Sequence, residues 1–315
     1  ASSDPSIRYK TRVHLLGDDP ASAAILALRQ DIRESERVRK LLAERTADGT
    51  LPYPAYAKWY GAHWVLAALA DLDYPPGDDE LDPLREQVYA MLFSETHVQN
   101  ARRLTIAGRT RMCASIEGNA INALLAHGLA DERVGVLAKS LLAWQWPDGG
   151  WNCDKHREAR VSSFTESLIP LRGLARYART TGDASATVAC RRAAEVFLER
   201  RLFRRKTDDS VISPDFLKLH HPCYWHYDIL FALRVMDGAG FLEDPRCAEA
   251  LAILENKRLP DGGFPADEKY YQSTSARATY WWPADWGGTS RRRANQFMTV
   301  EALAVLRRAD VRRPP

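Results

Sequence analysis

A recurring turn constrains the fold of this chain more than any other feature of its sequence. Residues 141–153 read LLAWQWPDGGWNC, an apolar helix end that leads into Pro-Asp-Gly-Gly and then an aromatic residue. Similar stretches follow Leu41 and Ile253, and worn copies without the glycines follow Met91 and Phe197. The copies are 50 or 56 residues apart, which leaves room for two helices and two turns. Such a period predicts a repeat of helical hairpins along the chain.

Apolar periodicity places the helices of these hairpins, and no alternating run is long enough for a useful strand. The second helix of each pair is the more apolar one, which predicts an inner ring of helices sheathed by an outer ring. We therefore expect an all-α fold, a single α/α toroid of five to six hairpins over residues 25–308, with a polar arm at 1–24 and a tail at 309–315. An open solenoid is the alternative. The expected helices cover residues 21–44, 56–72, 84–93, 112–129, 133–143, 162–179, 184–201, 223–237, 245–255 and 293–307.

Charge and cysteine content narrow the possible partners and the compartment. Lys and Arg number 44 against 41 Asp and Glu, a balance that argues against a nucleic-acid partner. No run approaches the roughly 20 apolar residues of a transmembrane segment, and the first residues lack the apolar core of a signal peptide. Five cysteines without close paired spacing do not form a disulfide framework. These features predict a cytoplasmic protein and leave its oligomeric state open.

The stretch LLAWQWPDGGW resembles the QW repeat of the terpenoid cyclase and protein prenyltransferase superfamily, whose fold is an α/α toroid. SIRYKTRVHLLG, CASIEGN and YWHYD are similar to segments of single-domain bacterial proteins with prenyltransferase and squalene-oxidase repeats. The resemblance covers most of the chain and implies a terpenoid-cyclase-like enzyme. Two departures matter. The Asp-x-Asp-Asp acid of class II cyclases is missing, and Ser162, Ser163 and Glu166 stand roughly where protein prenyltransferases carry zinc ligands.

If outer and inner helices alternate, all inner helices start at one end of the ring. Their unpaired N–H groups and positive dipole ends meet at that mouth and favour an anionic group. The first turns of these helices, and the loop after Trp151, also carry acids, thiols and imidazoles. The catalytic candidates are Asp154, Glu117, Glu166, Asp228, His226, Cys113, Cys153 and His63.

These residue types suit acid–base chemistry without a metal. A carboxyl group in a dry aromatic cavity has a raised pKa and can donate a proton, and aromatic faces stabilise a carbocation. We therefore expect a lyase or isomerase that acts on a small apolar or isoprenoid substrate by acid-initiated cyclisation, isomerisation or (de)hydration. The expected substrate-binding residues are Trp59, Tyr224, Trp225, Trp282 and Asn119.

Three alternatives stay open, and no cofactor is assured. A zinc enzyme would draw its ligands from Cys113, Cys153 and His226 and keep an open position for a thiol or water. A sugar lyase or epimerase would have a polar cavity lined by Tyr, His and Arg. A non-catalytic toroid that binds a lipid or peptide would have a deep apolar hole, with its carboxylates in salt bridges.

Overall fold

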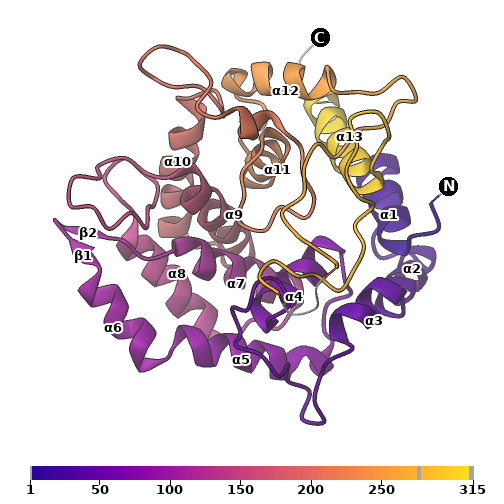
Figure 1. Cartoon of the computed structure of the whole chain (residues 1–315), viewed down its shortest axis with the longest axis horizontal. Helices are drawn as coiled ribbons and strands as arrows, with labels where there is room; N and C mark the ends of the chain where they lie inside the picture. The colour runs from indigo at the N-terminus through magenta and orange to yellow at the C-terminus, as the bar shows by residue number, and fades with distance from the viewer. Residues whose placement is uncertain (1, 275–277, 312–315) are drawn as a thin grey trace.

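The computed structural model describes residues 2–274 and 278–311 and is built almost wholly of helices (Figure 1). The all-α prediction is confirmed. Strands within the described residues are limited to a small hairpin of β1 (Thr105–Ile106) and β2 (Arg109–Thr110). The helices are α1 (Pro5–Lys10), α2 (Ala23–Arg33), α3 (Glu36–Leu42), α4 (Ala62–Asp71), α5 (Asp82–Leu92), α6 (Glu95–Arg103), α7 (Ala114–Ala126), α8 (Glu132–Trp144), α9 (Phe164–Thr181), α10 (Ala184–Leu198), α11 (Ile229–Ala239), α12 (Ala248–Glu255) and α13 (Gln296–Val311).

Inner and outer helices alternate along the chain, and the inner helices α4, α7 and α11 are strongly apolar, as the sequence predicts, whereas the inner helices α9 and α13 are more polar than their outer neighbours α8 and α12. Helix α7 packs between α4 and α9, α9 also packs on α11, and α11 packs on α13, while α5, α8, α10 and α12 lie outside them (Figure 1). Two glycines allow the close approach of α7 and α9. A Cβ atom on Gly118 would lie 2.6 Å from the Cα of Pro170, and one on Gly173 would lie 2.4 Å from the carbonyl oxygen of Gly118.

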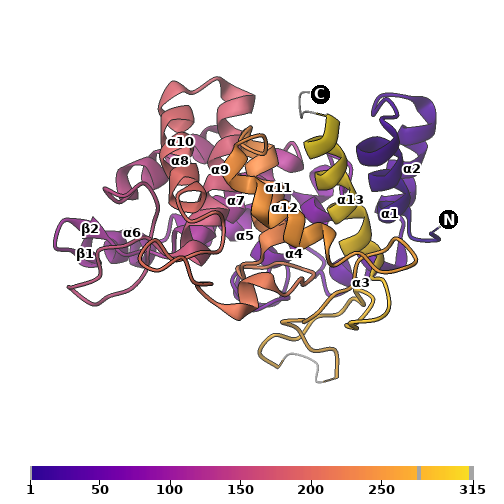
Figure 2. The ribbon, with the colours of Figure 1, turned by 90° about the horizontal axis from the view of Figure 1, so that it is seen from above.

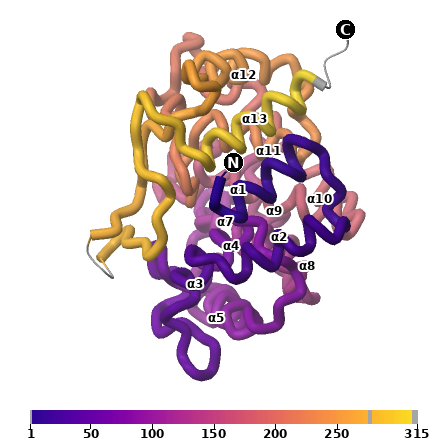
Figure 3. Tube along the Cα trace, turned by 90° about the vertical axis from the view of Figure 1, so that its right-hand side faces the viewer, coloured from indigo at the N-terminus to yellow at the C-terminus, as the bar shows by residue number. Residues whose placement is uncertain are grey.

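The beginning and the end of the chain meet (Figures 2 and 3). Helix α1 packs against α13, and Lys10 forms ion pairs with Asp73, just after α4, and with Glu301 of α13. At the opposite ends of these helices, the backbone N–H of Trp59 donates to the carbonyl of Trp281. These contacts bring the first and last hairpins together. A fully closed α/α toroid, with the expected domain limits, stays a prediction, and residues 312–315 of the expected tail lie outside the described residues.

Several element boundaries differ from the prediction because local capping and tertiary contacts set them. The helix expected over 21–44 breaks at Ser35, whose hydroxyl accepts the N–H of Val38 and starts α3. Helix α11 starts at Ile229, six residues later than expected, because the carboxylate of Asp228 caps it. Residues 5–10 of the expected polar arm form a helix whose side chains are partly buried, and α6 was not expected at all.

The Pro-Asp-Gly-Gly turns at 147–150 and 260–263 differ in what surrounds them, which allows a matched test. Gly149 has φ +102°, and a Cβ on it would lie 2.3 Å from the carbonyl oxygen of Arg192 on α10, whereas Gly262 has φ +83° and no atom within 4 Å. We expect Gly149→Ala to lower the free energy of unfolding by about 1–3 kcal/mol more than Gly262→Ala, because only the first forces a clash. Urea unfolding of both variants measures this. Equal losses would show that the turn at Gly149 has room to relax.

Candidate functional site

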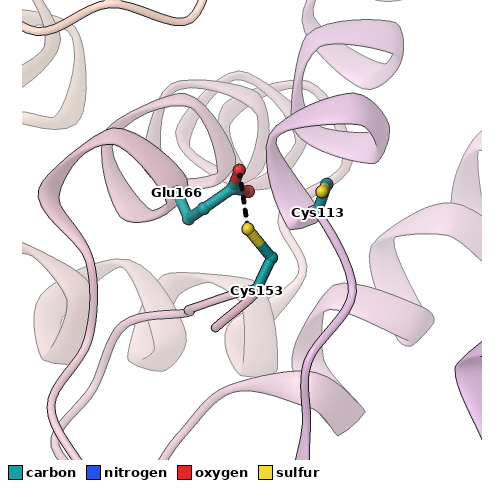
Figure 4. Close-up of side chains that lie close together, drawn as sticks. All are labelled: Cys113, Cys153 and Glu166. Carbon is teal, nitrogen blue, oxygen red and sulfur yellow. Dashed lines mark hydrogen bonds between the residues drawn. The ribbon is translucent and has the colours of Figure 1, made fainter. Parts of the chain in front are cut away.

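Two thiols and a carboxylate lie together where α7 and α9 begin; we call Cys113, Cys153 and Glu166 the thiol–carboxylate cluster (Figure 4). Cys113 is the residue before α7, Glu166 lies in the first turn of α9, and Cys153 lies in the loop that precedes α9. One ligand atom from each residue lies within 4.8 Å of the others, and the thiol of Cys153 donates to Oε1 of Glu166 at 3.5 Å. The sequence-predicted thiols therefore meet a sequence-predicted acid.

The local fold holds this cluster in place from several sides. The buried guanidinium of Arg111, two residues before Cys113, donates to the carbonyl of Asp154 at 2.6 Å and so ties α7 to the Cys153 loop. The carboxylate of Asp148 accepts the N–H of Ser162 at 2.7 Å, which ties the preceding turn to the start of α9. Arg111 thus acts as a structural clamp between the start of α7 and the Cys153 loop.

The groups of the cluster perturb one another's pKa. The interaction between the two thiols lowers the pKa of Cys113 and raises that of Cys153. Burial raises the pKa of Glu166, although the N–H of Ser115 at the start of α7 donates to its Oε2 at 3.1 Å. Among the ion pairs formed by the described residues, none includes Glu166. The cluster is therefore rich in acidic groups and poor in compensating positive charge.

Glu117 lies one helical turn from Cys113 and is fully buried. Its carboxylate contacts a residue that was not among the candidates predicted from the sequence. Its Oε1 is 2.6 Å from Nε2 of His97 on the outer helix α6, and its Oε2 has no hydrogen-bond partner within the described chain. Burial raises the pKa of Glu117, as expected for an acid candidate. The hydroxyl of Tyr56 faces the same region, and its pKa is raised by burial and by the nearby Cys113 and Glu166.

His63 and Asn119 are brought together, and both are buried. Nε2 of His63 lies 3.2 Å from the side-chain amide of Asn119, and Nδ1 of His63 has no partner within the described chain. Burial lowers the pKa of His63 to about 3, so the imidazole is neutral at pH 7. The ring of Tyr56 packs 5.5 Å from that of His63. Asn119, expected to bind substrate, is instead positioned to orient an imidazole.

The predicted aromatic substrate contacts divide into a buried stack and an accessible rim. Trp59 and Trp282 are almost completely buried; Trp59 stacks on Tyr224 at 3.8 Å, and Trp282 packs edge-on against the same tyrosine. The indole N–H of Trp59 donates to the carbonyl of Tyr270. These three side chains are therefore core packing rather than contact surface, because their ring faces are already covered by one another. Trp225 alone of the expected aromatics remains partly exposed.

A pocket of about 370 Å³ opens beside this stack. The imidazole of His226 lies between Trp225 and Tyr270, with ring centroids 4.0 Å and 3.5 Å away, and Tyr280 lines the same pocket with 41% of its surface exposed. Burial, together with the charges of His220 and Lys58, lowers the pKa of His226 to about 3. Nδ1 of His226 has no hydrogen-bond partner within the described chain. The imidazole is thus a neutral base with an unused nitrogen.

Lys58 lies at the edge of this pocket among aromatic rings. Its ammonium nitrogen is 5.1 Å from the centroid of Trp225, 5.6 Å from Tyr280, 5.9 Å from Tyr56 and 5.8 Å from Trp59. No carboxylate within the described residues forms an ion pair with it. A cation held by rings alone is available to bind an anionic group on a ligand. We call Lys58, His226 and the rings of Trp225, Tyr270 and Tyr280 the aromatic pocket.

Two predicted acids occupy places that do not suit the expected role. Asp154 is not in a dry cavity: 43% of its side chain is exposed, and hydrogen bonds from His156 lower its pKa. Asp228 is fully buried but is already committed, because it caps α11 and lies 2.8 Å from Nδ1 of His220. Asp154 is therefore too exposed to be the expected proton donor. Asp228 does not suit that role either, because it is already paired within the structure.

A second pocket, of about 280 Å³, lies among α4, α7, α9, α11 and α13. Charged side chains line it, including Asp71, Arg172, Arg176, Arg234 and Glu301. Burial and neighbouring arginines lower the pKa of Arg176 to about 10, and its Nε donates to the side chain of Asn122 at 2.9 Å. The space that the inner helices share is thus strongly polar.

Comparisons with known proteins give one structural similarity. No family model matches the chain, and no curated protein matches it. A solved structure described as a polysaccharide lyase is similar over 98% of this chain and 90% of its own, at 13% identity and a TM-score of 0.49. The helices of residues 2–274 and 278–311 are too short or too polar to cross a bilayer.

The prediction of a terpenoid-cyclase-like enzyme that acts on an isoprenoid is wrong. The molecule itself supplies a physical reason, since arginines and carboxylates line the pocket between the inner helices. An apolar chain placed there would strip water from these charges without replacing its hydrogen bonds. The resemblance to the cyclase and prenyltransferase superfamily stays a prediction about ancestry and fold.

The sequence did not identify several residues that complete these sites. His97 reaches Glu117 from an outer helix, and Tyr56, Tyr270 and Tyr280 lie in segments without regular structure. Only their residue type could have drawn attention to them. The ligand set expected for zinc also changes. Among the described residues the two thiols lie beside Glu166, and His226 does not belong to this cluster.

Proposed function

We propose that the protein is an enzyme that acts on an anionic carbohydrate, as a sugar lyase or epimerase does. The observation that carries this proposal is the aromatic pocket, in which a neutral imidazole and a lysine without a carboxylate partner lie among aromatic rings. Aromatic faces stack on the C–H surfaces of sugar rings, and a lysine pairs with a uronate carboxylate. Polar groups such as Lys269 and Gln272 also line the pocket and suit hydroxyl groups.

The chemistry begins with removal of the proton next to the carboxylate of a uronate residue. His226 accepts this proton, and Lys58 stabilises the negative charge that develops on the carboxylate oxygens. In a lyase, the electron pair of the broken C–H bond forms a carbon–carbon double bond, and the bond to the glycosidic oxygen breaks. The imidazolium then returns a proton to the leaving oxygen. In an epimerase, the glycosidic bond stays intact and a water molecule donates a proton to the carbon on its other face.

A bound carboxylate would favour this reaction because it would raise the pKa of the His226 imidazole. Burial and the positive charges of His220 and Lys58 hold the pKa of His226 at about 3. A uronate carboxylate beside Lys58 neutralises one of these charges and raises the pKa of His226. The base is therefore strengthened only when an anionic ligand is present. All five cysteines are free thiols, in keeping with the expected cytoplasmic location. A cytoplasmic enzyme of this kind would act on an oligosaccharide.

Incubation of the purified chain with a panel of uronate oligosaccharides in deuterated water tests the proposal. Elimination gives an unsaturated sugar that absorbs ultraviolet light, and epimerisation gives deuterium in the sugar by mass spectrometry. We expect His226→Ala to lower kcat by about 10²–10⁴-fold, and Lys58→Met to raise KM and lower kcat. His156→Ala, at a histidine side chain that is 90% exposed, is the matched control and should leave both unchanged.

The outcomes separate the proposal from its rivals. Activity on uronates that survives His226→Ala unchanged would remove the aromatic pocket as the site. Failure of every uronate to give either an unsaturated product or deuterium incorporation, with no detectable sugar binding, would overturn the proposed function.

A further inference from the structure

We propose that Cys113, Cys153 and Glu166 bind one zinc ion at the shared start of α7 and α9 (Figure 4). The three residues come from positions that are 40 and 13 residues apart and still present their ligand atoms to one point. Two thiolates and a carboxylate are ligands that zinc accepts in proteins, and a three-ligand site keeps a fourth position for water or substrate.

The spacing of the ligand atoms suits a tetrahedral site. With usual Zn–S and Zn–O bond lengths, a sulfur and a carboxylate oxygen on one zinc ion lie about 3.6 Å apart. The sulfur of Cys153 and Oε1 of Glu166 are 3.5 Å apart, and the remaining ligand separations stay within 4.8 Å. Small side-chain rotations therefore suffice to close the cluster on an ion.

The surroundings of the cluster resemble the outer shell of a metal site. The N–H of Ser115 donates to Oε2 of Glu166, which leaves Oε1 turned toward Cys153. Arg111 holds the carbonyl of Asp154 and so fixes the Cys153 loop beside the start of α7. Hydrogen bonds of this kind orient the groups that bind a metal directly. The cluster is thus held in position by contacts that do not use the ligand atoms themselves.

Charge gives an independent reason for a cation at this place. Glu166 is partly buried and forms no ion pair with a lysine or arginine among the described residues, and Oε2 of the nearby buried Glu117 has no hydrogen-bond partner there. Lys155 lies near Cys113 but forms no ion pair with Glu166 within the described residues, and a divalent cation would compensate the two thiolates and the carboxylate.

Metal titration of the full chain tests the site without any substrate. Protein that has been reduced and treated with EDTA is mixed with zinc chloride, and bound zinc is counted by elemental analysis after gel filtration. We expect one zinc per chain. We also expect cobalt(II) to give a thiolate-to-cobalt charge-transfer band, which Cys113→Ala and Cys153→Ala should each reduce to about half or less, since each removes one of two thiolates.

Competition with a chromophoric chelator measures the affinity of the variants. Cys153→Ala and Glu166→Gln should weaken zinc binding by at least about 100-fold, more than the loss typical of outer-shell changes. Cys190→Ala, at a buried thiol of the outer helix α10, is the matched control and should bind zinc as the unaltered chain does. Circular dichroism confirms that each variant is folded, and Cys113→Ala, at an accessible position, gives a second ligand variant if Cys153→Ala unfolds.

Four results would overturn the inference. The first is zinc binding well below one ion per chain. The second is an unchanged zinc affinity in folded variants of the ligand residues, and the third is an equal loss of zinc affinity in Cys190→Ala. A Cys113–Cys153 disulfide that persists under mild reduction would also overturn it. The test uses no sugar, so its failure leaves the proposed function standing, and inactivity on uronates leaves the zinc site standing.

Discussion

Replacing Lys10 with methionine is expected to lower the free energy of unfolding by about 3–5 kcal/mol, because it leaves buried carboxylates without their cation. Only 5% of the Lys10 side chain is exposed, and its Nζ lies 2.8 Å from Asp73 and 3.0 Å from Glu301. Burial alone would lower the pKa of Lys10, but these two carboxylates outweigh it and raise the pKa above its usual value. Glu301 would keep Arg234, whereas within the described residues Asp73 would keep His14, whose Nε2 lies 3.8 Å away.

Lys40→Met is the matched control for this prediction. Lys40 forms an i,i+4 pair with Glu36 at 2.7 Å, but half of its side chain is exposed. Its loss should cost no more than about 0.5 kcal/mol. Urea unfolding of both variants at neutral pH measures the difference. If Lys10→Met is no less stable than Lys40→Met, the ion pairs between α1, the end of α4 and α13 do not hold the two ends of the chain together.

Asp228→Ala is expected to destabilise the protein by a similar amount, about 3–5 kcal/mol, since it breaks a buried pair. Asp228 and His220 are each 1% exposed, and the carboxylate accepts the N–H groups of His220 and Phe231 as well as pairing with the imidazole. Asp228→Asn keeps an acceptor for these N–H groups and should lose less, about 1–3 kcal/mol. Asp183→Ala, at the partly exposed cap of α10, should lose only about 1 kcal/mol.

The same pair gives the protein a pH dependence whose sign can be stated. Burial alone would lower the pKa of His220, but the Asp228 carboxylate raises it above its usual value. The folded chain therefore binds a proton more tightly than the unfolded chain. The stabilisation is complete below the unfolded value of about 6.5 and is lost as pH rises through the folded pKa. Asp228→Asn should flatten this part of the stability profile. A profile that is unchanged in Asp228→Asn would show that the pair does not titrate in this way.

Asp228 also illustrates how a plausible acid differs from a structural carboxylate. The sequence places Asp228 at the start of an apolar helix, near His226, where an acid and a base would be useful. The fold turns its carboxylate back toward His220 and the first turn of α11, where three hydrogen-bond donors occupy it. His226 instead lies between two rings and keeps a free nitrogen. The two residues, two positions apart, have separate roles.

The sequence by itself determined the helical character of the chain and the order of its inner and outer helices. Both follow from contacts within a few residues, since a helix that is apolar all round must be covered on all sides. The turn at residues 145–150 and the strongly apolar α4, α7 and α11 were visible for this reason. Cys113, Cys153, Glu166, Glu117 and His226 were also recognisable as candidates from their residue type and their place near inner-helix starts.

Only the tertiary structure decided which of these candidates meet. The pairing of Cys153 with Glu166, of His97 with Glu117 and of Lys10 with Glu301 joins segments whose separation depends on how whole helices pack. Periodicity records that a side chain is buried, but it does not record its neighbour across the helix interface. For the same reason the sequence could not distinguish Trp59, whose face is covered by Tyr224, from Trp225, which remains open to a ligand.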